Sequence, residues 1–414
     1  MLTLNKTIGM IKDYVYDPQT LEVARKSPVY FTRKRKMDFP QVVFFLLNTV
    51  NTSTYTALNR FFKNVIGEST RMSQQALSKA RSHIDHSPFQ GMFRELNRKR
   101  YGFGNKVNKW HGYQVLAVDG SDITLPNLPE LLKIFGGSGR NADSPMATAS
   151  IMLDILNDFV IDACLEPYGT SERKMALGHI DELRGLCPNG KKLLIFDRGY
   201  PSLELIQALC QKQLSFVMRV RAKWNTDADN TSASDCRVTL SDGTIIRVIK
   251  LILSYGETET LITNLWRIKE NEFMPLYFLR WPVETKYDVV KNKLALENFS
   301  GVSENSIRQD FWVSMLLCNI VSVAKNEATC LIRLRRHSKE NLHEYIPNTA
   351  DLVASLKDDF VTACMETSIK KRGDRITAVI EDIAHSVVPV RPGRHVPRRA
   401  PRKAKFHFNA KSST

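Results

Sequence analysis

The sequence predicts a mixed α/β core that is preceded and followed by helical regions. Residues 1–110 and 304–388 carry apolar side chains at helical spacing. Between them, short apolar runs of strand length alternate with two helical segments. Their order is strand, strand, strand, helix, strand, helix, strand, which predicts three antiparallel strands followed by crossover units in a single sheet.

The first region, residues 1–110, contains the outline of a helix-turn-helix. Residues 55–66 have a helical apolar pattern, and Ser73 can cap a second helix over residues 74–84. A polar, basic helix after a short turn is typical of DNA recognition, but an ordinary pair of packed helices has the same outline. The candidate DNA contacts on the second helix are Gln74, Ser78, Lys79 and Arg81.

The core is predicted over residues 111–303. Its strands are expected at residues 113–118, 149–156, 159–165, 192–196 and 216–221, and its helices at residues 171–186 and 203–211. Residues 222–266 contain short β-like runs between turn residues, which predicts a β-rich insertion. A further helix is expected around residues 277–291.

The C-terminal part is predicted to be helical over residues 304–388. The apolar run at residues 311–324 is short for a membrane span and contains Asn319, so a buried helix is expected. The tail, residues 389–414, has eight Lys or Arg residues, several prolines and no acid. We expect this tail to be disordered alone and able to lie along phosphates.

The composition favours a polyanionic partner. The net charge of +16 makes nucleic acid the first candidate and an anionic membrane surface a distant alternative. The seven cysteines are odd in number and form no CxxC pair, which argues against a zinc cluster or a disulfide framework and fits a reducing cytoplasm. The N-terminus lacks an apolar signal core, so a soluble protein without a membrane partner is expected.

Two acids stand where predicted strands end. Asp119 follows residues 113–118 and precedes a glycine, and Asp197 follows residues 192–196 in the same context. An Asp-Gly pair after a strand is often only a turn. Asp122 could replace Asp119 as the functional acid, but Asp119 is preferred because it directly follows the apolar run. Four more aspartates are interpreted as turn or surface residues: Asp143, Asp154, Asp158 and Asp162.

A third acid, Glu284, belongs to a group of four residues that begins at Tyr277. Arg280, Glu284 and Lys291 follow Tyr277 by three, seven and fourteen residues. These separations place all four side chains on one face of an ideal helix. A carboxylate beside cations suits a metal ion next to phosphates, although a solvated helix face has the same spacing. Pro282 is disfavoured inside a helix, so the regular helix is predicted to begin near Trp281 or Pro282.

Three carboxylates brought together can hold two divalent cations about 4 Å apart. Such a pair activates a water or a 3′-hydroxyl and stabilises the leaving oxygen of a phosphodiester. Mg²⁺ fits because it prefers hard oxygen ligands, and no set of His and Cys residues competes for a softer metal.

Together the three acidic motifs resemble those of the DDE transposases of bacterial insertion sequences. The matching stretches are Asp119-Gly120-Ser121, Asp197-Arg198-Gly199-Tyr200 and Tyr277-x2-Arg280-x3-Glu284-x6-Lys291, the last being the Y-x2-R-x3-E-x6-K signature. The resemblance covers about residues 110–300. It implies an RNase H-like catalytic core with the acids on the first strand, after the fourth strand and on a helix, and with the β-rich insertion at residues 222–266.

The resemblance also implies an activity and its site. Asp119, Asp197 and Glu284 would bind two Mg²⁺ ions, or Mn²⁺, and catalyse cleavage at the element's ends followed by strand transfer into target DNA, as in cut-and-paste transposition. Tyr277, Arg280 and Lys291 would hold phosphates near the cut. Trp281 would stack a flipped base if a hairpin forms, or else lie in the core.

The implied partners are double-stranded DNA and a second copy of the chain. The N-terminal helices would bind the inverted-repeat ends, and a homodimer would form the synaptic complex in the cytoplasm, on the nucleoid. Two other functions stay open at this point: an RNase H-like nuclease without strand transfer, and a non-catalytic DNA-binding regulator derived from a transposase. The presence of all three acids argues against the regulator.

Overall fold

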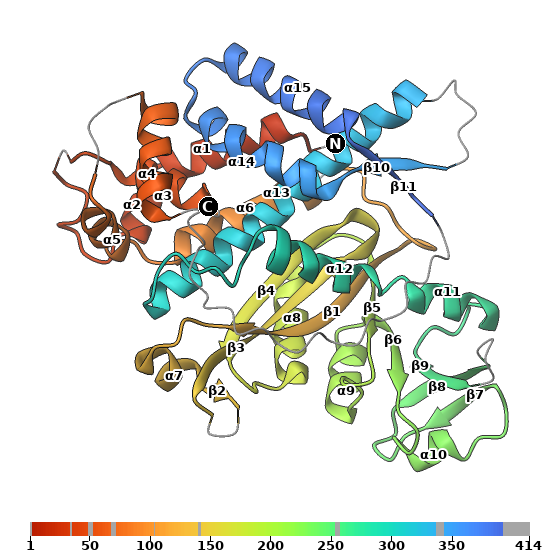
Figure 1. Cartoon of the computed structure of the whole chain (residues 1–414). Coiled ribbons are helices and arrows are strands. Elements are labelled where there is room, and N and C mark those ends of the chain that lie inside the picture. Colours follow the sequence, from red (N-terminus) through yellow and green to blue (C-terminus); the bar gives the residue numbers. More distant parts are fainter. Residues whose placement is uncertain are drawn as a thin grey trace. The chain divides into compact units, whose positions relative to one another are not determined.

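The computed structural model describes residues 2–33, 35–48, 53–67, 72–102, 104–139, 142–252, 257–336 and 343–391. The chain divides into two compact units (Figure 1). The sheet unit consists of Tyr101–Thr124 and Phe135–Asp288, and the helical unit consists of Met1–Arg100, Leu125–Ile134 and Val289–Thr414. The helices that precede and follow the core, predicted as separate regions, therefore belong to one unit.

The described strands of the sheet unit form one sheet in the order β2-β3-β1-β5-β6-β9-β8-β7, and β4 pairs with β3 on the edge opposite β1. Their bounds are β1 Tyr113–Thr124, β2 Gly137–Ser138, β3 Ser144–Asp154, β4 Phe159–Pro167, β5 Lys191–Phe196, β6 Ser215–Val220, β7 Asp235–Thr239, β8 Ile245–Ile252 and β9 Thr258–Thr263. As predicted, β1, β3 and β4 follow one another in antiparallel pairs, while β5 pairs in parallel with β1 and β6 in parallel with β5.

The centre of the sheet is the parallel pair β1 and β5. Their apolar runs are fully buried, as expected of parallel strands that are covered on both faces. Their pairing ends at Ala117 opposite Ile195, whereas the pairing of β1 with β3 continues to Thr124. The prediction that β1 ends at residue 118 was therefore wrong, because β3 keeps the polar residues beyond it extended. Asp119 lies inside β1, just past the end of its pairing with β5.

The β-rich insertion extends this sheet. Strand β9 pairs antiparallel with β6, and β8 and β7 follow in an antiparallel ribbon. This arrangement fits the predicted insertion, with β9 leading directly towards the segment that carries the third acid.

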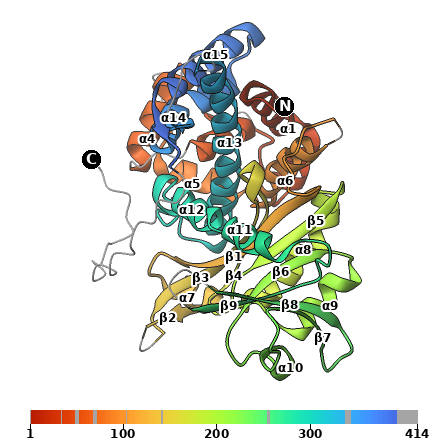
Figure 2. The ribbon, with the colours of Figure 1, turned by 90° about the vertical axis from the view of Figure 1, so that its right-hand side faces the viewer.

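The helices of the sheet unit include α8 (Glu172–Leu186), α9 (Leu203–Gln211), α10 (Thr226–Asp229), α11 (Phe273–Phe278) and α12 (Pro282–Asp288). Helix α12 begins at Pro282, as predicted, because proline fits the first turn, where its missing N–H has no helical acceptor. Figure 2 shows α11 and α12 above the strands of this unit.

The helical unit is built around α13. Its helices are α1 (Leu4–Tyr16), α2 (Pro18–Ala24), α3 (Phe39–Leu47), α4 (Thr54–Phe61), α5 (Gln74–Ser82), α6 (Ser87–Tyr101), α7 (Pro129–Phe135), α13 (Glu304–Arg336), α14 (Thr349–Met365) and α15 (Ile369–His385), of which α6 and α7 each end in the first residue of the sheet unit. A short ribbon pairs β10 (Tyr345–Pro347) with β11 (Val387–Pro389). The predicted cap of the second N-terminal helix is confirmed, since Ser73 Oγ accepts a hydrogen bond from the N–H of Ala76.

Helix α13 contains the apolar run that was expected to be buried. By length and composition this helix could cross a membrane, but most of its apolar window is buried inside the protein. Its buried side chains include Phe311, Met315 and Ile320, so the expectation of a buried helix is confirmed. The predicted basic tail lies outside the described residues from position 392 onward.

Candidate active site

Three acids that are far apart in the sequence gather around one arginine in the sheet unit. Asp119 comes from β1, Asp197 follows β5, and Glu284 lies in the first turn of α12. The guanidinium of Arg280 donates a 2.8 Å hydrogen bond to Glu284 Oε1. Its nitrogens also lie 3.7 Å from Asp119 Oδ2 and 3.9 Å from Asp197 Oδ2.

Arg280 is held between two short helices rather than on a continuous one. Its N–H donates to the carbonyl of Tyr277 at the end of α11, and its own carbonyl accepts from Val283 in α12. Only 8% of the residue is exposed. Burial alone would lower the pKa of Arg280, but Tyr277, Asp197 and Asp119 outweigh it and raise this pKa. The Nε atom of Arg280 has no hydrogen-bond partner in the described part of the chain.

Tyr277 contacts the second acid directly. Its hydroxyl donates a 2.9 Å hydrogen bond to Asp197 Oδ1. Burial, and then the negative charge of Asp197, raise the pKa of Tyr277, so the phenol stays a hydrogen-bond donor. In this structure Tyr277 therefore orients Asp197.

The first acid, Asp119, has a raised pKa. Burial raises the pKa of Asp119 to about 6, Glu172 and Glu284 raise it too, and Arg280 opposes the shift. Its main-chain carbonyl accepts hydrogen bonds from Tyr287 Oη at 2.9 Å and from Ser150 Oγ at 3.2 Å. The backbone at Asp119 is thus tied to α12 and to β3.

Two buried polar side chains, His179 and Asp162, form a hydrogen-bonded chain that ends at Ser150. His179 Nε2 lies 3.0 Å from Ser150 Oγ, and His179 Nδ1 lies 2.7 Å from Asp162 Oδ2. This Ser-His-Asp arrangement is not a nucleophilic site, because Ser150 is fully buried and its hydroxyl is donated to the Asp119 carbonyl.

Two of the aspartates interpreted as turn or surface residues are in fact buried. Asp162 pairs with His179, and Asp154 accepts hydrogen bonds from Tyr101, Gln114 and Asn157. Partners supplied by other elements compensate these buried charges. Asp158 does occupy a turn, with a left-handed backbone, and it anchors α12 because buried Lys286 Nζ lies 2.6 Å from its Oδ1.

A fourth carboxylate, Glu172, was not predicted. It stands in the first turn of α8, and its side chain lies against two glycines of the acidic motifs. A Cβ added to Gly120 would lie 2.8 Å from Glu172 Oε1, and one added to Gly199 would lie 3.4 Å from Oε2. Burial, and then Asp122 and Asp197, raise the pKa of Glu172. The two glycines are the only sequence signal of its position, and they do not identify the side chain that fills the space.

The idea of a single helical face was wrong in part. Tyr277 is in the last turn of α11, Arg280 is in the connecting turn, and Glu284 is in α12, so two short helices bring these side chains together. Lys291 lies in the helical unit, in a π-helical turn (Val289–Lys293), with Nζ 3.7 Å from Glu297 Oε1. Trp281 is 55% exposed, so the alternative of a core residue is excluded.

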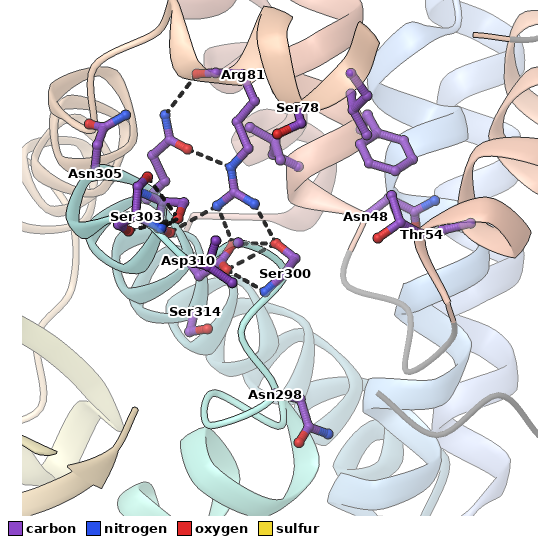
Figure 3. Close-up of a pocket in the computed structure, with 18 of the residues that line it drawn as sticks. Asn48, Thr54, Ser78, Arg81, Asn298, Ser300, Ser303, Asn305, Asp310 and Ser314 are labelled. Carbon is purple, nitrogen blue, oxygen red and sulfur yellow. Dashed lines mark hydrogen bonds and ion pairs between the residues drawn. The ribbon is translucent and has the colours of Figure 1, made fainter. Parts of the chain in front are cut away.

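Arg81 was predicted to contact DNA, but this prediction was wrong because its side chain is buried. It is only 7% exposed, and its guanidinium donates to Gln309 Oε1 and Ser300 Oγ at 2.6 Å and to Asp310 Oδ1 at 2.8 Å (Figure 3). Arg81 follows buried Leu77 by four residues, which places both on the inner face of α5. Gln74, Ser78 and Lys79 are exposed, and the first two line a cavity of about 430 Å³ within the helical unit.

The donor set suits a hard divalent cation, but the side chains are not arranged as a preformed metal site. Among the described residues, no three acids, histidines or cysteines converge closely enough to hold an ion. Arg280 instead stands among the carboxylates and balances part of their charge. Carboxylate oxygens without thiolate or imidazole neighbours are the ligands that Mg²⁺ and Mn²⁺ prefer.

The core of the chain is similar to known proteins. The family model described as the transposase DDE domain matches residues 110–320. InsZ of Escherichia coli (strain K12), which is named as a transposase, is 23% identical over 186 residues, which span 44% of this chain and 60% of InsZ. The matched region is thus less than two thirds of that relative.

Among solved structures, the chain is similar to the piggyBac transposase in a synaptic complex with hairpin DNA. The TM-score is 0.52 at 11% identity, and the match covers 95% of this chain and 87% of that one. At this identity the likeness shows the fold alone. It confirms the predicted RNase H-like α/β core with a β-rich insertion and helical flanking regions.

Proposed function

Since this chain belongs to the family of the transposase DDE domain, we propose that it cuts DNA at the ends of an insertion sequence and transfers the freed strands into target DNA. The observation that carries the proposal is the convergence of Asp119, Asp197 and Glu284 on one guanidinium. Three acids from three separate elements would repel one another, and such a cluster is costly unless a cationic ligand uses it.

Asp119, Asp197 and Glu284 would hold two Mg²⁺ ions, for which Mn²⁺ could substitute. Bound there, the ions would activate a water or a 3′-hydroxyl and stabilise the leaving oxygen of the phosphodiester. The chain's own residues hold the acids in place: Tyr277 orients Asp197, and Lys286 anchors the helix of Glu284 through Asp158.

Several side chains are candidates for DNA contact near the acids. Arg280 has an unused Nε among the described atoms, and its guanidinium suits a phosphate once metal ions neutralise the carboxylates. Tyr277 and Lys291 are proposed as further phosphate contacts. Exposed Phe278 and Trp281 flank Arg280 in the sequence and offer ring faces for an unstacked base.

In the helical unit, α5 presents an exposed polar face to a DNA end. Gln74, Ser78 and Lys79 are exposed on it, whereas Arg81 holds the helix in place. We propose that this face contributes to recognition of the inverted repeats and that two copies of the chain bring two ends together.

The test uses isosteric variants: Asp119→Asn, Asp197→Asn and Glu284→Gln. Each is expected to abolish Mg²⁺-dependent cleavage of a duplex that carries the inverted repeat bordering this gene, while leaving binding to that duplex intact. Asp181→Asn is the matched control, because Asp181 is an exposed acid on α8 whose partner is Lys212. Cleavage by the Glu284 variant at the wild-type rate would refute the assignment.

Strand transfer separates the proposed transposase from the two other functions. Pre-cut ends with a free 3′-hydroxyl are incubated with a target plasmid and Mg²⁺, and joined products are measured. A transposase joins the ends, an RNase H-like nuclease cuts duplexes without joining, and a DNA-binding regulator does neither. EDTA is expected to stop both reactions.

A further inference from the structure

Glu172 lies at the start of α8, a helix that carries none of the three predicted acids, and its negative charge acts on Asp119. Its carboxylate fits against Gly120, the neighbour of Asp119, and close to Gly199, two residues after Asp197. It therefore lies beside the backbone of the two motifs that contain Asp119 and Asp197. A Cβ at Gly120 would come within 2.8 Å of Oε1, so the absence of a side chain there leaves room for this carboxylate.

The surroundings of Glu172 are acidic. Within the described residues its carboxylate has no hydrogen bond and no ion pair. Burial, and then the negative charges of Asp122 and Asp197, act on it and raise its pKa. It also adds to the negative charge that acts on Asp119. Although Glu172 is exposed as a residue, a carboxylate beside other carboxylates is unfavourable unless a cation compensates it.

A second observation concerns a buried hydroxyl next to these acids. The hydroxyl of Tyr200 is buried, with the residue only 1% exposed, and it has no hydrogen-bond partner in the described part of the chain. The groups that act on it electrostatically are Glu172, Asp119, Arg280 and Asp197. A buried hydroxyl without a partner costs free energy, so the cluster is incomplete as the chain alone forms it.

We propose that Glu172 is a fourth carboxylate of the metal site, which acts with Asp119 and Asp197 in binding a divalent cation. The proposal rests on the proposed function of those two acids and adds a ligand to it. It also explains the glycine beside Asp119, since a side chain at Gly120 would displace the carboxylate of Glu172.

A purely structural role predicts different behaviour. An acid in the first turn of a helix stabilises that helix through the positive end of its dipole, and Glu172 occupies such a position in α8. Replacing it by glutamine would then lower the stability of the protein and leave cation binding unchanged. If Glu172 is a ligand, the same change removes a like charge, so metal-free stability is maintained and cation binding is weakened.

The experiment is a titration of the full-length protein with Mn²⁺ alone, followed by electron paramagnetic resonance of the free ion, with thermal unfolding in EDTA as the folding check. Glu172→Gln is expected to weaken Mn²⁺ binding about tenfold or more, in the range found when a metal site loses a supporting group. Gly120→Ala is expected to behave like Glu172→Gln, and Asp181→Asn like the wild type.

The outcomes distinguish this proposal from the function on which it rests. If Asp119→Asn and Asp197→Asn lose Mn²⁺ binding while Glu172→Gln keeps the wild-type affinity, Glu172 is not a ligand and the proposed function stands. If the wild-type protein binds no Mn²⁺, or if neither aspartate variant differs from it, both proposals fail. Weaker binding by Glu172→Gln with an unchanged melting temperature in EDTA supports the fourth carboxylate.

Discussion

The hydroxyl of Tyr287 donates a 2.9 Å hydrogen bond to the main-chain carbonyl of Asp119. Tyr287 follows Glu284 by three residues on α12, so the helix of the third acid is bonded to the backbone of the first. The same hydroxyl lies 3.3 Å from the carbonyl of Ala149 on β3. One buried phenol thus fixes the position of α12 relative to two strands.

Tyr287→Phe is expected to lower the free energy of unfolding by about 1–3 kcal/mol, because two buried carbonyls lose a donor. It should also slow DNA cleavage without weakening DNA binding, since Glu284 would be held less firmly relative to Asp119. Urea unfolding and single-turnover cleavage measure the two effects. Tyr168→Phe, a change at a partly exposed tyrosine of the same unit, should alter neither. A destabilised variant that cleaves at the wild-type rate would contradict the positioning role.

The raised pKa of Asp119 predicts how the stability of the metal-free protein depends on pH. This pKa is about 6 in the folded chain against an ordinary value of 3.8, so the folded state holds the proton more tightly than the unfolded state. The stabilisation from Asp119 is therefore present below pH 3.8 and is lost as pH rises through 6. Its size is on the order of 3 kcal/mol.

Unfolding in EDTA across this pH range measures the effect. Asp119→Asn should remove the loss of unfolding free energy that Asp119 causes as the pH rises through 6, whereas Asp181→Asn should keep the wild-type dependence on pH. An equal decline in the Asp119→Asn variant and in the wild-type protein would show that other groups cause it. In the presence of Mg²⁺, cleavage should fall at acid pH with a midpoint below the metal-free pKa of about 6, because the bound cation favours the ionised carboxylate.

The sequence predicts the apolar elements of this fold well, because their patterns are local. Helix α9 and strand β5 match their expected ranges closely, since turn residues mark both ends. The polar end of β1 was mistaken for a turn because its extended form depends on pairing with β3, which the local sequence does not show.

The candidate site is predictable only in part, for a related reason. Gly120, directly after Asp119, shows that space is needed there, but the occupant, Glu172, depends on how α8 packs. Asp162 and His179 have no local pattern that pairs them, although the helical spacing of Leu77 and Arg81 was sufficient to place Arg81 on the inner face of α5.

Arg81 and Lys79 lie on the same helix, but replacing each by alanine is expected to affect different properties: stability for Arg81 and DNA binding for Lys79. Arg81→Ala leaves Asp310 and Gln309 without their buried partner, so a loss of about 3–5 kcal/mol in unfolding free energy is expected. Lys79→Ala should leave stability unchanged and weaken binding to the DNA end, with a salt dependence lower by about one charge. Chemical unfolding and binding at several salt concentrations test this pair, and equal stability losses for both would refute it.

The guanidinium of Arg280 stands where the charge of a metal ion is needed, and this predicts competition between the two. At about 4 Å and an effective dielectric constant of about 20, one cation and one carboxylate attract by about 4 kcal/mol. Arg280→Ala is therefore expected to strengthen Mn²⁺ binding by the DNA-free protein about tenfold or more, while reducing cleavage because a phosphate contact is lost. Arg198→Ala is the matched control, since Arg198 follows Asp197 directly but pairs with Glu259. Weaker Mn²⁺ binding by the Arg280→Ala variant would show instead that Arg280 holds the acids together for the metal.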